Sequence, residues 1–218
     1  MKNRSCGELP QLLLIMDIEL ANSRINIWPI AVLMLAVYGW LRWRKTHNLP
    51  YILSLVVFGI YTIFTLDATI FPIPILGEYA EMMRENVSFL ERINWEPFYF
   101  GEYGLTSSHN TSIFQNIILT IPFGFGILFV TTWNRKVFIW LPWAVGVGFE
   151  ACQFLISLAL GYPYRVVDIN DALFNAVGVI IGYGILKLMM WLFLKIYGRP
   201  DHQRNNLLGY FYNVAGRV

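Results

Sequence analysis

The sequence predicts an all-α membrane protein, a polytopic helix bundle with about five transmembrane helices and a structured external loop. Of its 218 residues, 56% are hydrophobic and only 14% are charged, whereas a soluble domain usually carries about 25% charged residues. So little charge cannot cover a surface in water, and lipid is therefore the expected solvent. The second observation is a series of apolar stretches that approach the roughly 20 residues needed to cross a bilayer.

Five stretches are predicted to span the membrane, at residues 25–41, 51–71, 112–132, 137–160 and 171–194. The first contains Pro29, which a helix tolerates in its first turns. The second ends at Pro72 and Pro74. The apolar stretch 12–16 is too short to span, so residues 1–24 are predicted to form a tail with an interfacial helix.

Basic residues predict the orientation, because Lys and Arg collect on the cytoplasmic side. They are dense in the short segments after the first and third spans: Arg42, Arg44, Lys45, Arg135 and Lys136. Residues 195–218, also basic, are then a cytoplasmic tail, and the N-terminus lies outside, although Lys2, Arg4 and Arg24 oppose this assignment. Residues 72–111 become an external loop long enough to have structure of its own, with a surface helix over 79–93.

The fourth span contains two polar residues, Glu150 and Gln153, which are three residues apart and share a helix face. A charge inside hydrocarbon costs at least about 2.5–3.5 kcal/mol on insertion scales, so it usually faces a protein interior or a cavity. Glu150 can therefore pair with a basic or amide group to hold the bundle together. It can equally act as a general acid or base, or bind a head group.

The start of the fifth span carries a stripe of residues at steps of three and four: Asp168, Asp171, Asn175, Gly178 and Gly182. Asp168 is expected to cap the helix, with Asp171 in its first turn, where the helix dipole favours carboxylates. The two glycines form a pair that lets helices approach closely. Asn175 lies one turn inside and needs a polar partner there.

Two further residues complete a predicted polar patch. Arg165 is the expected counter-charge for Glu150, Asp168 or Asp171, and Asn116 shares a face of the third span with Thr120. Pro122 interrupts that span, and the carbonyl it frees needs a neighbour or a water. The patch is expected to open outward and to consist of Asn116, Glu150, Gln153, Arg165, Asp168, Asp171 and Asn175.

Two other charges in the spans are assigned no role in this patch. Asp67 lies near the outer end of the second span and is expected to reach the interface. Lys187 lies in the inner half of the fifth span and can extend its amine to the cytoplasm.

Four sequence pieces resemble the VanZ-like family. They are INWEPF (Asn94, Pro97, Phe98), QNIILTIPFGFG (Asn116, Pro122, Gly124), FEACQ (Glu150, Gln153) and R-x-x-D-x-x-D-x-x-x-N-x-x-G-x-x-x-G-Y, from Arg165 to Tyr183. The resemblance runs from about residue 94 to 186, and the combination is specific. The loop LALGYPYRVVD departs from the family, in which it is often shorter and more polar.

The resemblance implies a multi-pass protein of the bacterial plasma membrane. The member that gives the family its name is linked to low-level teicoplanin resistance without rebuilding of the peptidoglycan precursor. This chain would then contribute to glycopeptide or lipoglycopeptide resistance. Membrane lipids, a lipid-linked cell-wall component or the antibiotic itself would be its partners.

Three functions remain open at this stage. The polar patch could bind or modify an envelope component. Alternatively, the protein could be an intramembrane enzyme acting on a lipid or polyprenyl-phosphate head group, with Glu150 and Asp171 as candidate catalytic residues and Arg165 holding a phosphate. A transporter or ion pathway through Asp67 and Glu150 is the third, weakened by the lack of an inverted repeat. No Cys/His metal spacing occurs, so we expect no metal, no cofactor and, given the small net charge of +2, no nucleic acid.

Overall fold

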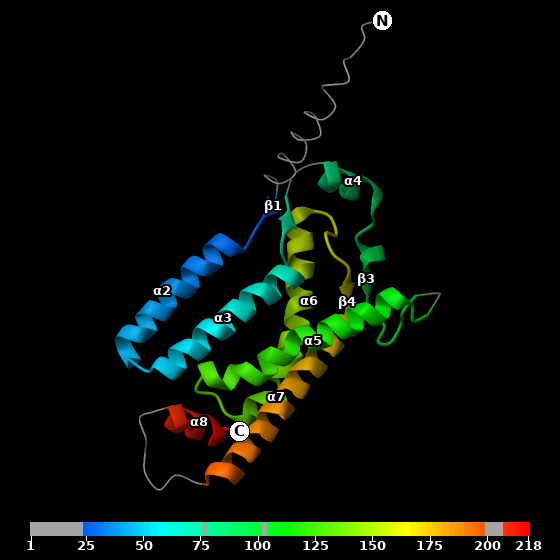
Figure 1. Cartoon of the computed structure of the whole chain (residues 1–218). Coiled ribbons are helices and arrows are strands. Elements are labelled where there is room, and N and C mark those ends of the chain that lie inside the picture. The colour runs from blue at the N-terminus through cyan, green and yellow to red at the C-terminus, as the bar shows by residue number, and fades with distance from the viewer. Residues whose placement is uncertain (1–23, 76–77, 102–103, 199–206) are drawn as a thin grey trace, which may run out of the picture.

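A computed structural model describes residues 24–75, 78–101, 104–198 and 207–218, and most of this part is helical (Figure 1). The α-helices are α2 (Trp28–Thr46), α3 (Leu49–Thr69), α4 (Glu78–Asn86), α5 (Ser107–Val130), α6 (Leu141–Leu160), α7 (Ile169–Tyr197) and α8 (Leu207–Ala215). The strands are two residues each: β1 (Arg24–Ile25), β2 (Ile73–Pro74), β3 (Ile93–Asn94) and β4 (Val167–Asp168). The all-α prediction is confirmed. The predicted N-terminal tail lies outside the described residues, apart from Arg24.

Four helices of the described chain are long and apolar enough to cross a membrane: α3, α5, α6 and α7. They correspond to the second to fifth predicted spans. α5 begins earlier than predicted because Thr106 caps it, accepting a hydrogen bond from the His109 backbone N–H while the His109 ring accepts from the Thr106 N–H. α6 begins later because Arg135–Ile139 form a 3₁₀ turn. In both cases local capping or a tighter turn, rather than hydropathy, decides where the helix starts.

The first predicted span is helical as α2 but does not belong to these four helices. α2 has 19 residues, and its last turn carries Arg44 and Lys45, which shortens its apolar part. It packs on α3, where Gly59 lies against the side chain of Leu35. Figure 1 shows the two helices as an antiparallel pair beside the bundle. Large apolar side chains such as Leu33 and Met34 are exposed on α2, as expected of a surface that faces lipid.

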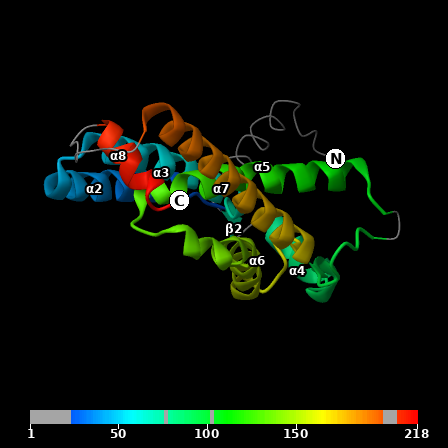
Figure 2. The same cartoon turned by 90° about the horizontal axis from the view of Figure 1, so that it is seen from below.

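The centre of the molecule is the crossing of α5 over α7. Gly178 lies against the backbone carbonyl of Ile117, and Gly124 lies against that of Val179. The Thr120 hydroxyl crosses the same contact and donates to the Asn175 carbonyl at 2.8 Å. The close approach predicted from the glycine pair is therefore present. Figure 2 shows α2 and α3 near one end of α5 and α4 toward the other.

Pro122 leaves α5 continuous, and a neighbour contributes a hydrogen bond near the interruption. Tyr61 of α3 donates from its hydroxyl to the Leu119 carbonyl at 2.8 Å. Pro122 has no N–H and so frees the carbonyl four residues earlier, that of Ile118. Leu119 is the residue next to it. α3 thus supports α5 where its backbone ladder is weakest.

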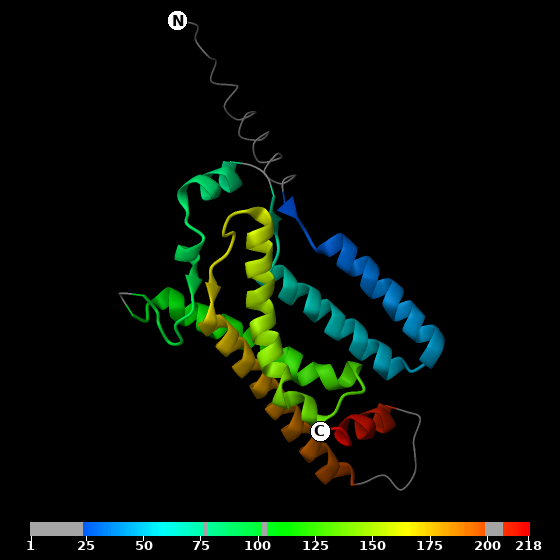
Figure 3. The same cartoon turned by 180° about the vertical axis from the view of Figure 1, so that it is seen from behind.

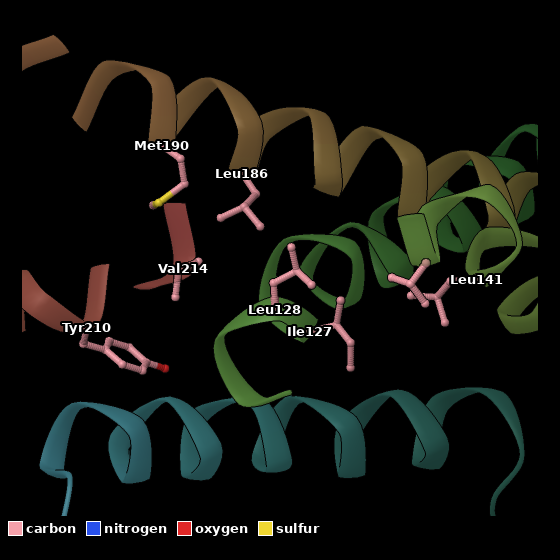
Figure 4. Packing of buried hydrophobic residues seen from close by; sticks show 8 residues of the cluster. Ile127, Leu128, Leu141, Leu186, Met190, Tyr210 and Val214 are labelled. Atoms are coloured by element: carbon pink, nitrogen blue, oxygen red, sulfur yellow. The ribbon is translucent and has the colours of Figure 1, made fainter. Parts of the chain in front are cut away.

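An apolar cluster fills the end of the bundle where the chain finishes (Figure 4). Its labelled members come from α5, α6, α7 and α8: Ile127, Leu128, Leu141, Leu186, Met190, Tyr210 and Val214. Residues 195–218 were predicted as a tail, but α8 packs here, with Val214 fully buried. The Tyr210 hydroxyl also donates to the Phe129 carbonyl at 2.7 Å.

The opposite end carries the segment predicted as an external loop, which is structured as expected. The predicted surface helix over 79–93 is shorter: α4 ends at Asn86, and a 3₁₀ turn follows at Leu90–Arg92. β1 pairs antiparallel with β2, and β3 pairs parallel with β4. Figure 3 shows α4 and β3 beside the end of α6 and the start of α7. This pairing brings the loop against the residues predicted for the polar patch.

Candidate functional site

A cavity of about 560 Å³ lies among the end of α3, the first half of α5, the middle of α6 and the start of α7. Six of the seven residues of the predicted patch line it: Asn116, Glu150, Gln153, Arg165, Asp171 and Asn175. The seventh, Asp168, lies outside this lining and caps α7. The structure thus brings together residues that are up to 59 positions apart (116 to 175).

Glu150 is buried, with 7% of its surface exposed. One carboxylate oxygen accepts a hydrogen bond from the Asp168 backbone N–H at 2.9 Å, which ties α6 to the start of α7. Of the two expected kinds of partner, a basic or an amide group, the hydrogen bond to this carboxylate thus comes from an amide of the backbone. A buried carboxylate with one satisfied oxygen keeps acceptor capacity for a second donor.

Arg165 was expected as the counter-charge for Glu150, Asp168 or Asp171, and within the described structure it makes no direct ion pair with any of them. Its guanidinium donates to the Phe71 carbonyl at 3.1 Å and lies over the Tyr164 ring, 5.9 Å from the centroid. Since Arg165 lines the same cavity as Glu150 and Asp171, its charge faces theirs across the cavity. A planar guanidinium in this position retains N–H groups for an anionic ligand.

Gln153 connects α6 to α3. Its side-chain amide donates to the Thr69 carbonyl at 3.1 Å, and both residues are buried. The sequence predicted a patch built from three spans, whereas Thr69 and Ala68 of α3 also line the cavity. This contribution was missed because it comes from a backbone carbonyl, which no side-chain pattern reveals.

Asn175 is 2% exposed, and its side-chain oxygen has no hydrogen-bond partner among the described residues. The described residues therefore do not supply the polar partner that was predicted for this oxygen. A buried acceptor without a donor costs about 1–3 kcal/mol. Because Asn175 lines the cavity, a water or a ligand donor in the cavity can satisfy it.

The loop motif reaches the site through Asn94. Asn94 pairs in register with Asp168, and its side-chain amide donates to a carboxylate oxygen of Asp168 at 3.0 Å. The same Asp168 oxygen accepts from the Asn170 backbone N–H at 2.8 Å, which is the predicted helix cap. One carboxylate thus fixes both the loop and the start of α7.

Asn170 is a residue of this region that the sequence interpretation missed. It is 2% exposed; its side-chain oxygen accepts from the Phe98 N–H at 2.6 Å, and its amide donates to the Tyr99 carbonyl at 3.0 Å. Phe98 has a φ of 63°, and both its side chain and Pro97 are exposed. Asn170 does not belong to the stripe of residues at three- and four-residue steps. The sequence therefore indicated it only by its place between Asp168 and Asp171.

The two remaining charges lie elsewhere. Asp67 is half-buried near the end of α3 and lies outside the lining of this cavity, and Lys187 is exposed on α7. Among the described residues, no group of three His, Cys, Asp or Glu side chains could hold a metal ion.

The cavity combines two carboxylates, one guanidinium and four side-chain amides with apolar residues. Ile118 and Val166 line it and are about half exposed. Its volume lies within the roughly 300–1,000 Å³ of small-molecule sites. Such a lining can hydrogen-bond a polar head group while an attached hydrocarbon chain follows the apolar residues.

A family model described as VanZ/LLP1 matches residues 58–192. The match covers most of α3, all of α4 to α6 and most of α7, including every residue that lines the cavity. Comparisons with curated proteins and with solved structures give no match.

Proposed function

The chain belongs to the VanZ/LLP1 family, whose match covers more than half of it, and from this premise we propose that it lowers bacterial susceptibility to lipoglycopeptides such as teicoplanin. It does so in the plasma membrane, by binding or modifying a lipid-linked envelope component in the cavity around Glu150. The helices of the fold support a membrane protein. Membership of the family does not by itself name an antibiotic or a ligand, and both are proposed here.

The observation that carries this proposal is the mixed lining of the cavity. Glu150 and Asp171 accept hydrogen bonds from sugar hydroxyl or amide groups, and Arg165 matches a phosphate through paired N–H donors. Ile118 and Val166 offer an apolar path toward the lipid. A head group that combines sugar or peptide with phosphate on a hydrocarbon chain meets all three requirements.

The cavity is at the end of the bundle where α5 and α7 begin and α6 ends, and the basic residues at the other end support an outward orientation. Arg42, Arg44, Lys45 and Arg135 lie near the α2–α3 connection and beyond the end of α5. Since Lys and Arg favour the cytoplasmic side, the cavity faces the side from which an added antibiotic arrives.

The test is teicoplanin tolerance in a susceptible bacterial host that overexpresses the chain. The wild-type protein is expected to raise the minimum inhibitory concentration, and Glu150→Ala or Asp171→Ala to abolish the gain. Glu85→Ala is the matched control, because Glu85 is an exposed acid on α4 outside the cavity. Membrane levels of every variant are measured by immunoblot. Full tolerance in both cavity variants at equal levels contradicts the site.

An enzyme acting on the same head group is the second candidate, and the pair of carboxylates in one cavity supports it. Glu150 and Asp171 could serve as acid and base. Glu150→Gln separates the two candidates, because glutamine still accepts from the Asp168 N–H but cannot transfer a proton. Retained tolerance in this variant supports binding, whereas complete loss, together with a changed lipid product in mass spectra of the wild type, supports catalysis.

A further inference from the structure

A second cavity, of about 550 Å³, lies at the other end of the bundle. It is an open cavity between the α2–α3 connection, the end of α5 and α8, and its lining includes Arg42, Asn48, Tyr51, Tyr212 and Arg217. None of the described residues that line it is an Asp or Glu. It is therefore a cationic cavity with hydroxyl and amide groups around it.

Arg217 is half-buried, and the hydrogen-bond acceptors that it contacts are neutral carbonyl groups. Its guanidinium donates to the carbonyls of Asn213 and Thr131. Burial lowers the pKa of this guanidinium below its ordinary value, yet an arginine side chain stays protonated in proteins. A half-buried cation whose neighbours are carbonyl oxygens is stabilised further by an anion that approaches its remaining N–H groups.

Arg42 lies on another wall of the same cavity. Its Nε donates to the Tyr51 hydroxyl at 3.2 Å, and its guanidinium carbon lies 5.1 Å from the centroid of that ring. The Tyr51 hydroxyl in turn donates to the Val130 carbonyl at 3.4 Å. These contacts hold the guanidinium in place, and none of the described residues hydrogen-bonds its two terminal nitrogens, whose geometry suits a phosphate.

The position of the cavity matches a membrane–water interface. Val130, which lines it, is 14 residues from Asn116 of the first cavity, so about 21 Å of α5 separates the two. The exposed indoles of Trp43 and Trp133 lie in the chain next to the lining residues Arg42 and Thr132. Tryptophan is enriched at the level of lipid head groups.

We propose that this cavity binds a phosphate-bearing anion between Arg42 and Arg217. The two sources of this chemistry are the head group of an anionic phospholipid and a small soluble phosphate. The interfacial position favours the lipid, because basic pockets between helices at the cytoplasmic face are suited to anionic head groups. α8 then does more than fill the core, since it carries one of the two arginines.

The test is native mass spectrometry of the full chain purified in detergent, with phosphatidylglycerol, phosphatidylcholine or inorganic phosphate added. Wild-type protein is expected to retain phosphatidylglycerol in preference to phosphatidylcholine. Arg42→Gln and Arg217→Gln should each weaken retention about tenfold or more, the worth of one charge-assisted hydrogen bond. Arg44→Gln is the matched control, because Arg44 is exposed, lies over the Trp40 ring and does not line the cavity.

Inorganic phosphate separates the two sources. If phosphatidylglycerol stays bound when phosphate is added, the lipid is the source. If phosphate itself binds in a way that depends on both arginines, the soluble anion is the source. Because Arg217 also holds the end of α5, Arg42→Gln is the decisive variant once its thermal unfolding matches that of the wild type. The proposal is overturned if folded Arg42→Gln binds both anions like the wild type, or if phosphatidylcholine is retained as well as phosphatidylglycerol.

Discussion

The side chain of Asn170 joins the loop motif to the start of α7 with two hydrogen bonds of opposite direction. It accepts from the Phe98 N–H and donates to the Tyr99 carbonyl. Next to it, Asp168 presents its own N–H to Glu150. The position of the buried carboxylate in the cavity therefore depends on a loop that belongs to another part of the sequence.

Replacing Asn170 tests how much its two hydrogen bonds stabilise the protein. Asn170→Ala leaves the Phe98 N–H and the Tyr99 carbonyl without their partner, so the free energy of unfolding should fall by about 1–3 kcal/mol. Hydrogen exchange of a peptide that contains Phe98 should accelerate. The measurements are denaturant unfolding and exchange mass spectrometry of the protein in detergent.

Asn170→Asp is the comparison variant for the exchange measurement. The carboxylate keeps an acceptor for the Phe98 N–H, but its second oxygen replaces the amide donor and faces the Tyr99 carbonyl, so stability should fall in this variant too. The Phe98 peptide should stay protected in this variant. If the Phe98 peptide exchanges at the same rate in the wild type and in Asn170→Ala, Asn170 does not hold this segment against the start of α7.

Residue patterns identified most of the cavity and missed what the backbone contributes. Asn116, Glu150, Gln153, Arg165, Asp171 and Asn175 were all expected together, because a polar group in a hydrocarbon environment is costly enough to stand out. The partners were harder to predict. Glu150 contacts a backbone N–H, Gln153 contacts a backbone carbonyl, and Arg165 contacts Phe71 instead of a carboxylate.

The crossing of α5 and α7 sets how the two helices face each other across the cavity around Glu150, which both of them line. A β-carbon at Gly182 would meet the Ile121 carbonyl and the Phe125 backbone nitrogen of α5. Backbone atoms cannot move aside without separating the helices. Gly182→Ala should therefore lower the free energy of unfolding by about 1–3 kcal/mol.

A control glycine lies two residues further along α7. A β-carbon at Gly184 would meet nothing within 4 Å, so Gly184→Ala should not destabilise the protein and should raise its stability by up to about 1 kcal/mol, because alanine is the better helix former. Both variants are compared by thermal unfolding in the same detergent. Equal melting temperatures would mean that the close contact at Gly182 does not limit stability.

Helices were predictable where hydropathy defines them and less so where packing does. The second to fifth spans follow from their apolar length, and the four corresponding helices were found. α8 has only nine residues and was read as a tail, because its burial depends on Leu186 and Met190 of α7, which are distant in the sequence. α4 is shorter than predicted, since the periodicity of residues 79–93 continues past the end of the helix at Asn86.

At the scale of the whole molecule, the two cavities lie near opposite ends of α5. One contains carboxylates, amides and Arg165, and the other contains Arg42 and Arg217 without an acid among its described lining residues. Charge bias predicted the basic character of the second end but not a cavity there, because α8 forms one of its walls. The shared helix connects the proposed envelope site to the proposed anion site without requiring that they act together.

The cavity around Glu150 is proposed to hold a lipid-linked envelope component. A photo-crosslinking amino acid at Gln115, an exposed residue that lines the cavity, tests it directly in living cells. The same group at Leu188, which is 57% exposed on α7 outside this cavity, reports the surrounding lipid. After illumination, mass spectrometry identifies what each position captured. We predict an adduct with a phosphate- and sugar-bearing or peptide-bearing lipid at position 115 that is absent at position 188 and disappears in Glu150→Ala. Identical adducts of bulk phospholipid at both positions would mean that the cavity holds no specific envelope component.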